Sequence, residues 1–409
     1  MNSLLKVEKI PDFIFAALCL FWVSLTFSPA LTEISWMIGF ILWLFLKIRS
    51  KDFKFSVLNR SYLIPLAAFA AVCILSFFWS EYPTQSFRGI LKILQQIFTF
   101  IMIAEIFCQD RRLELFEKLT LIWAVVLGVD GFSQYFFGYD LIRHFHSQPS
   151  SAGVRITASF KSYGLFASYL ICIIPYLFVL GLRLRNTDKK WGHWYFALLG
   201  IASSVTLLIL TRTRGAFLSL ILSILVLFAY KRRFQWIVLI MLVAGGTLMI
   251  LPKTMIYHLD FQHKEQSIVE RFYLWNRAIE VIYAKPLTGT GINTYVVAHS
   301  KYDKTKNWRV KNYYAHNGYL QMAAEIGIPG LLFFLTFLFI HLKLILKDLN
   351  EVSHRNRNLL FGLLAGIFSF LFFSLVDTVL HNPSSVMIFW FLLGLESAYH
   401  KTISPISPR

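Results

Sequence analysis

The chain has 409 residues, of which 56% are hydrophobic and only 15% are charged, and Phe alone accounts for 40 of them. Such a composition excludes an ordinary soluble enzyme and a disordered chain, and it predicts an all-α polytopic membrane protein. The net charge of +18 raises the question of an anionic partner, which the position of the basic residues must answer.

About twelve segments are apolar over the roughly 20 residues that a helix needs to cross a bilayer. We expect them to begin near residues 12, 33, 61, 90, 119, 163, 193, 215, 236, 328, 358 and 385. The first, Ile14 to Phe27, is followed by no small-residue cleavage pattern, so we expect it to be retained. Residues 1–409 then form one membrane domain.

Lys and Arg gather in alternate connections, which the positive-inside rule assigns to the cytoplasm together with both termini. These basic connections lie around residues 6–9, 47–60, 111–112, 183–190, 231–233 and 343–357. The opposite set should face outward, and it comprises residues 81–88, 138–162, 211–214, 251–317 and 377–385. Residues 252–317 therefore form one large outer loop.

This topology accounts for most of the positive charge, so we expect no nucleic-acid partner. The outer loop is an exception, because residues 252–317 hold ten Lys or Arg against five Asp or Glu. An anionic ligand would explain that excess. The alternative is simple attraction to anionic membrane lipids, without chemistry.

Other polar residues inside or between the apolar segments have plainer interpretations. The four cysteines, Cys19, Cys73, Cys108 and Cys172, are far apart and have no metal-ligand spacing, so we expect them to pack as small apolar residues. His144 and His146 have no cluster of Cys or carboxylates beside them, and we predict no metal site. Glu105, Asp130 and Asp377 are expected to be hydrogen-bonded, with Asp377 near enough to the outer face to take part in a site.

Arginines mark three places on the outer side. Arg155 precedes the segment that begins near Tyr163, and Arg212 and Arg214 share a connection of only a few residues. Arg271 lies four residues before Trp275, one helical turn, in a segment with helical apolar spacing. A guanidinium group has a planar donor fork that suits phosphate. The alternative is contact with lipid phosphates at the membrane surface.

The longest polar segment joins an apolar one at residues 315–330, AHNGYLQMAAEIGIPG. If residues 316–326 are helical, Asn317, Gln321 and Glu325 share one face, and His316 lies at its start. Gly327 and the following Pro and Gly then stop or bend the helix. Upstream, Gly289-x-Gly291 predicts a tight turn and is weak evidence for phosphate binding.

Taken together, these motifs resemble the superfamily of O-antigen ligases and O-antigen polymerases. The resemblance covers roughly residues 150–335 and rests on RITASF at 155–160, TRG at 213–215, Arg271-x-x-x-Trp275, KPLTGTG at 285–291 and the segment that starts with His316-Asn317. The chain has Thr213 where that family often has Ser, a mild departure.

The resemblance implies an integral-membrane glycosyltransferase of the bacterial inner membrane, with its site facing the periplasm, that needs neither a metal nor another cofactor. Its donor would be a glycan on undecaprenyl diphosphate. A basic outer loop favours a phosphate-bearing acceptor, lipid A-core, and hence the ligase. The alternatives are a polymerase that joins two carrier-linked units and, from another class, a transporter of lipid-linked glycan, although no paired halves are found.

Such a reaction assigns roles to the candidate residues. Arg214 and Arg271 would stabilise the departing diphosphate, and His316 would take the acceptor proton, or else orient the acceptor or bind phosphate. Attack opposite the leaving group predicts inversion at the anomeric carbon. The residues expected to bind substrate are Arg155, Arg212, Trp275, Asn317, Gln321 and Asp377.

Overall fold

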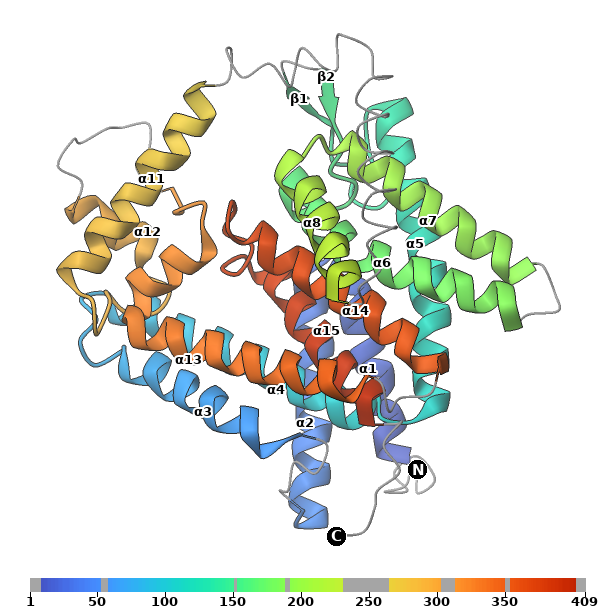
Figure 1. The fold of residues 1–409 in the computed structure, drawn as a ribbon, viewed down its shortest axis with the longest axis horizontal. Coiled ribbons are helices and arrows are strands. Elements are labelled where there is room, and N and C mark those ends of the chain that lie inside the picture. Colours follow the sequence, from blue (N-terminus) through green and yellow to red (C-terminus); the bar gives the residue numbers. More distant parts are fainter. Residues whose placement is uncertain are drawn as a thin grey trace.

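In a computed structural model, the chain is a bundle of long helices with one small hairpin (Figure 1). The structure describes residues 9–52, 58–150, 153–187, 192–230, 265–302, 313–349 and 354–401. Its longer helices are α1 (Ile10–Ser24), α2 (Pro29–Ser50), α3 (Arg60–Leu75), α4 (Pro83–Ile106), α5 (Asp110–Phe137), α6 (Tyr163–Thr187), α7 (Gly192–Leu210), α8 (Arg214–Tyr230), α11 (Glu265–Ala284), α13 (Gly318–Asp348), α14 (His354–Phe373) and α15 (Pro383–Lys401). The short elements are β1 (Gln148–Ser150), β2 (Gly153–Arg155), α12 (Tyr295–Ala298) and a 3-10 turn at His299–Lys301.

A helix lies at each place where an apolar segment was expected, apart from the one near residue 236, which falls outside the described residues. Four of the described helices, α2, α4, α6 and α13, are both long and apolar enough to cross a membrane, and five others are apolar but shorter. The protein is therefore an all-α membrane protein. Of the predicted outer loop, residues 252–264 and 303–312 lie outside the described part of the chain.

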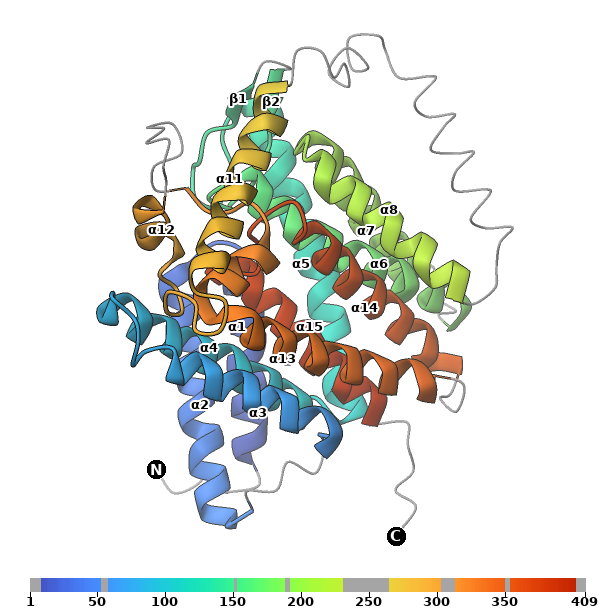
Figure 2. The same cartoon turned by 60° about the vertical axis from the view of Figure 1, so that its left-hand side comes forward.

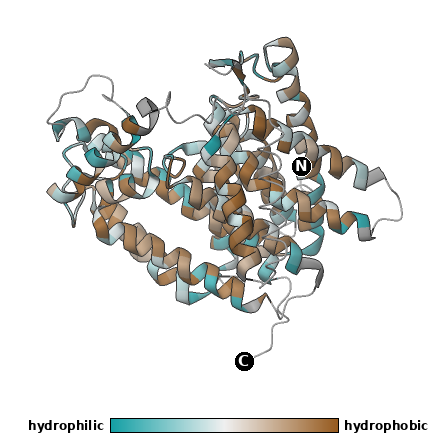
Figure 3. Ribbon diagram, turned by 45° about the horizontal axis from the view of Figure 1, so that its top comes forward, coloured by the Kyte–Doolittle hydropathy of each residue, from teal (hydrophilic) through white to brown (hydrophobic). Residues whose placement is uncertain are grey.

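Apolar residues occupy both the inside and the outside of this bundle, as hydropathy colouring makes plain (Figure 3). Phe100 and Trp390 are almost fully buried, whereas Ile34 and Ile41 of α2 are each 57% exposed. An exposed apolar face of this kind is unfavourable in water and suits contact with lipid tails.

Two glycines allow α14 to pack tightly on α6. A Cβ added to Gly366 would lie 2.2 Å from the carbonyl oxygen of Cys172, and one added to Gly362 would lie 2.9 Å from that of Pro175. Small residues four apart let helix backbones approach closely in a membrane, where packing replaces the hydrophobic effect between helices.

Ion pairs join helices near the ends that were predicted to be cytoplasmic. Glu105 accepts hydrogen bonds from Lys47 and from the indole of Trp43, each at 2.8 Å. Arg183 donates to Glu117 at 2.7 Å. The prediction that Glu105 is hydrogen-bonded is confirmed, and it holds for Asp130 as well, which accepts the backbone N–H groups of residues 141 and 142.

The connections that were predicted to face outward meet one another at the opposite end of the bundle. Ile156 donates its backbone N–H to Leu210, and Gly318 donates to Ser374. Glu81 pairs with both Lys285 and Lys301, and these hydrogen bonds and charges lower its pKa to about 2. Figures 1 and 2 show β1, β2 and α11 at this end.

Helix α13 bends where the sequence predicts a stop. Gly327 has a φ of 74° inside the helix, and Pro329 follows it. The turn after α11 docks on this bend, since Ile328 donates its N–H to Pro286 and Gly291 donates to Glu325. Gly289 and Gly291 both have positive φ, which confirms the predicted turn.

Candidate functional site

His316 lies just before α13, in a strained backbone conformation. Asn317 caps the helix by accepting the N–H groups of Tyr319 and Leu320, each at 3.0 Å, so the helix begins at Gly318, two residues later than predicted. His316 itself has a φ of 49°, a left-handed conformation that few non-glycine residues adopt. This turn directs its imidazole away from the helix axis and toward the segment after α14.

Asp377 faces that imidazole. Its Oδ1 lies 3.5 Å from Nδ1 of His316 and also accepts the backbone N–H of Thr378 at 2.7 Å. Burial raises the pKa of Asp377, but the interaction with His316, the Thr378 N–H and the charge of Arg271 outweigh burial and leave that pKa below its ordinary value. The carboxylate therefore stays ionised beside the histidine, and no partner for His316 Nε2 is observed among the described residues.

Helix α11 delivers Arg271 and Trp275 to the same place. Arg271 donates from Nη1 to the carbonyl oxygen of Val376 at 2.6 Å, and the indole N–H of Trp275 donates to the carbonyl oxygen of His316 at 3.1 Å. Two residues one turn apart on α11 therefore hold the backbones of Val376 and His316 in place. Among the described residues, no ion pair to the Arg271 guanidinium is observed.

Arg214 and Arg155 approach from the other side. Arg214 is the first residue of α8, and a Cβ added to its neighbour Gly215 would lie 3.0 Å from the Val376 side chain. Burial lowers the pKa of Arg214, and the positive charge of Arg155 is close enough to lower that pKa further. The Arg155 guanidinium lies over the ring of Tyr163 at 4.4 Å, and its Nε has no hydrogen-bond partner among the described residues. The helix that Arg214 begins therefore packs against the residue before Asp377, and Arg155 lies near enough to Arg214 for their charges to interact.

Arg212 differs from the other candidates. Its backbone is left-handed, with a φ of 54°, and no ion pair of its guanidinium is observed in the described part of the chain. Its role in substrate binding stays a prediction.

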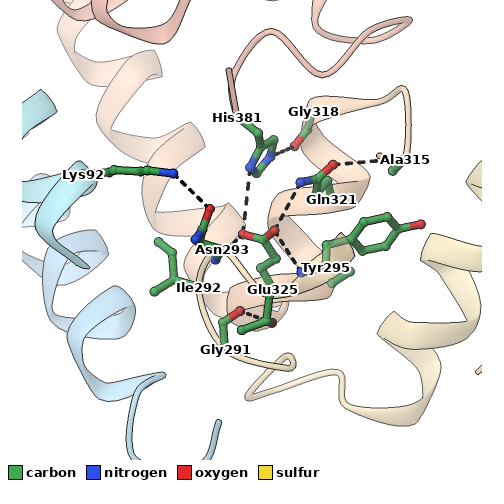
Figure 4. A network of polar contacts seen from close by, with 12 residues as sticks. Lys92, Gly291, Ile292, Asn293, Tyr295, Ala315, Gly318, Gln321, Glu325 and His381 are labelled. Atoms are coloured by element: carbon green, nitrogen blue, oxygen red, sulfur yellow. Dashed lines mark hydrogen bonds and ion pairs between the residues drawn. The ribbon is translucent and has the colours of Figure 1, made fainter. Parts of the chain in front are cut away.

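Gln321 and Glu325 form a buried polar network with the turn after α11 (Figure 4). Gln321 accepts from the Ala315 N–H at 3.3 Å and donates to Glu325 at 3.2 Å. Glu325 in turn accepts the backbone N–H groups of Asn293 at 2.7 Å and Tyr295 at 3.2 Å. The shared face is confirmed for Gln321 and Glu325, whereas Asn317 is the cap before the helix, and the Glu325 contacts hold the loop against α13. Substrate binding by Asn317 and Gln321 stays a prediction.

Sequence reasoning missed two residues near this network. His381 binds the carbonyl oxygen of Gly318 through Nε2 at 3.0 Å, and its Nδ1 lies 3.9 Å from Glu325. Lys92 of α4 donates to the Asn293 side chain at 3.4 Å. A signal for His381 was available, because it lies four residues after Asp377 in a polar segment between two apolar ones. Lys92 carries no such signal, since it lies within an apolar segment.

The arrangement combines a base with a cluster of cations. The Asp377 carboxylate lies 3.5 Å from Nδ1, an ion-pair contact without a hydrogen bond in this structure, and its charge favours a proton on Nδ1, which leaves the Nε2 lone pair to accept a proton. Arg271 binds the same segment, Arg214 begins the helix that packs on it and Arg155 lies near Arg214, so the three cations are suited to a polyanion such as a diphosphate. The site therefore fits removal of a proton beside a departing phosphate group.

Comparison with known proteins gives one family and one curated relative. Residues 199–335 match the family described as O-antigen ligase, and this segment includes Arg212, Arg214, Arg271 and His316. A protein of Rickettsia felis named "Putative polysaccharide ligase" is 29% identical over 140 residues, which are 31% of this chain. The chain spans only about a third, 32%, of the length of that relative.

Proposed function

The chain belongs to the O-antigen ligase superfamily, and from this premise we propose that it transfers a glycan from undecaprenyl diphosphate to a hydroxyl group of lipid A-core. The observation that carries the proposal is that His316, Asp377 and Arg271 meet at the segment that follows α14, with Arg214 at the start of the helix that packs on Val376 and Arg155 near Arg214. The reaction takes place at the periplasmic face of a bacterial inner membrane, with both termini in the cytoplasm.

The arginines act on the donor. As the bond between the anomeric carbon and the diphosphate oxygen breaks, negative charge grows on the leaving group. Arg271 and Arg214 stabilise that charge with N–H donors already held in place, so they favour the transition state over the bound donor. Arg155 adds a third cation. Because guanidinium groups supply this charge, the reaction needs no metal ion.

His316 acts on the acceptor. An acceptor hydroxyl attacks the anomeric carbon from the face opposite the diphosphate and loses its proton to Nε2, so the new bond has inverted configuration. Imidazole is the side chain best suited to take up a proton in reactions near neutral pH. Asp377 holds the tautomer in which Nε2 is the acceptor, and it stabilises the imidazolium that forms.

A transfer assay with purified protein tests the proposal. The donor is a glycan on undecaprenyl diphosphate, and the two acceptors, offered separately, are lipid A-core and a second carrier-linked unit, with a chelator present throughout. We expect the glycan on lipid A-core, with inverted linkage. Growth of chains on the carrier would assign the protein as a polymerase. Vesicle uptake without any covalent product would contradict transfer altogether and assign a transporter.

A further inference from the structure

A cavity of about 110 Å³ lies beside the His316 site and plays no part in the chemistry described above. It is enclosed by the outer ends of α2, α4, α13 and α15, together with the turn around Asn293. The polar network of Figure 4 forms part of its wall, since Glu325, His381, Asn293 and Lys92 all line it.

The lining changes from polar to apolar along the helices. Lys92 contacts Asn293 in the turn after α11, and His381 precedes α15, whereas Trp390 lies seven residues inside the start of α15. At 1.5 Å per residue, that is a descent of about 10 Å toward the middle of the bundle. Phe69 and Phe334 join Trp390 there, and all three are buried. The cavity therefore has a charged top and an apolar floor, like a lipid.

The mouth of the cavity faces the bilayer. Glu33 and Lys92 are exposed residues of its lining, and their immediate neighbours Ile34 and Leu91 are exposed apolar residues, at 57% and 52%. Exposed apolar side chains on a membrane helix contact lipid tails. A lipid can therefore reach the cavity from the membrane beside α4, where the hydrogen bond from Gln95 to Glu33 joins α4 to α2 at the mouth.

The charges at the mouth favour an anionic head group. Glu33 is already engaged by Gln95, which donates to it at 2.8 Å. Lys92 has only the long 3.4 Å contact with Asn293, and no carboxylate partner is found for it among the described residues. Lysine at the level of the lipid head groups attracts phosphate. Its ammonium group is the cation available to such a ligand.

We propose that this cavity seats one acyl chain of the acceptor lipid, with Lys92 bound to a phosphate of its head group. The inference rests on the proposed function for the identity of the lipid. The segment 377–381 connects the two places, because Asp377 faces His316 while His381 lines the cavity and binds Gly318, two residues after His316. A lipid in the cavity would thus place its head group near His316, where the acceptor reacts, while the arginines bind the donor.

Two pairs of variants separate the cavity from its surroundings. Ile93→Trp fills the cavity, whereas Leu91→Trp places the same side chain two residues away on the lipid-facing side of α4. Lys92→Gln removes the charge at the mouth, and Arg88→Gln removes an exposed charge one turn earlier that does not line it. Thermal unfolding of each purified variant in detergent checks its fold.

The experiment measures binding of radiolabelled lipid A to the purified full chain, and the KM for lipid A-core in the transfer assay. Ile93→Trp and Lys92→Gln should each weaken lipid A binding and raise the acceptor KM by about tenfold, the effect of losing a few buried methylene contacts or one ionic contact. The KM for the donor, and both control variants, should match the unmodified protein. Millimolar inorganic phosphate should not displace lipid A, because the chain supplies most of the affinity.

Several results would overturn the inference. They are unchanged lipid A binding in a folded Ile93→Trp variant, displacement of lipid A by inorganic phosphate, or a rise in the donor KM in place of the acceptor KM. The two proposals fail separately. If lipid A binds with the expected dependence on the variants but no glycan is transferred, the cavity assignment stands and the proposed function fails. If every variant transfers glycan normally, the proposed function stands and the cavity assignment fails.

Discussion

The orientation of the His316 imidazole depends on a strained backbone conformation that neighbouring residues stabilise. A non-glycine residue at φ 49° is strained by an amount on the order of 1 kcal/mol. The indole of Trp275 compensates by binding the carbonyl oxygen of His316, and the Asn317 cap fixes the residue that follows. The imidazole consequently meets Asp377 in a fixed orientation.

Arginine and lysine should not be interchangeable at the donor site. Arg271→Lys and Arg214→Lys keep the charge but lose the planar fork, and Arg271→Lys also loses the hold on Val376. We expect each to slow transfer by about 10- to 100-fold, the effect of one or two charged hydrogen bonds. Arg277→Lys serves as the control, because Arg277 lies on the same helix but binds Tyr302 and Glu280. Rates are measured at saturating donor and acceptor, and full activity in both test variants would reduce these arginines to lipid anchors.

The pairing of Asp377 with His316 predicts a pH dependence of stability. A carboxylate whose pKa is lowered by folding stabilises the protein above its unfolded pKa, here ordinarily 3.8, and loses that contribution as the pH falls through the lower folded value. Thermal unfolding in detergent should therefore show the unmodified protein to be more stable than Asp377→Asn at pH 6, with the gap closing below pH 3.8. A gap that persists unchanged at pH 2.5 would mean that the charge of Asp377 contributes nothing.

At the scale of elements, the bundle depends on close helix contacts that only glycine permits. Gly366→Ala would push a methyl group against the Cys172 carbonyl oxygen, so α6 and α14 must separate. We expect a loss of about 1–3 kcal/mol in stability. Gly200→Ala is the matched control, since the nearest atom to its new Cβ is an ordinary 3.5 Å away. The midpoints of thermal unfolding, measured in one detergent, should differ between the two variants, and equal midpoints would contradict the packing.

Helix α13 illustrates what sequence can and cannot predict about an element. The i, i+4 spacing of Gln321 and Glu325 predicted their shared face, and Gly327 with Pro329 predicted the bend. The spacing could not predict that Glu325 would accept N–H groups from a loop about 30 residues earlier, because that contact depends on tertiary packing. Glu325 is found to hold the loop in place.

At the scale of the whole molecule, the alternation of basic loops predicts which end faces outward. Ser300 is an exposed residue beside the Glu81 ion pairs and should lie in the periplasm. A cysteine placed there, in a background without the four native cysteines, should react with a membrane-impermeant maleimide in intact cells. A cysteine at Arg49, at the opposite end of α2, should react only after lysis. If the cysteine at position 300 does not react in intact cells, the predicted orientation is wrong.

That the chain is a helical membrane protein was predictable from composition, because apolar length reports directly on transfer into a bilayer, whereas the number of spans and their orientation stay predictions. The candidate site was predictable only as residue types. Arg271, Arg214 and His316 stood out by motif, but nothing local to position 377 indicated that it would meet residue 316 across the fold. The polar segment between two apolar ones could have indicated His381, but its place beside Lys92 in one cavity depends on how α4, α13 and α15 pack.

The most direct test of the account is the single-turnover rate of His316→Ala with saturating donor and acceptor. If Nε2 takes the acceptor proton, the rate should fall by about 10²- to 10⁴-fold while the donor binds as tightly as it does to the unmodified protein, because the arginines are intact. Loss of donor binding with an unchanged single-turnover rate would contradict this role and make His316 a phosphate ligand.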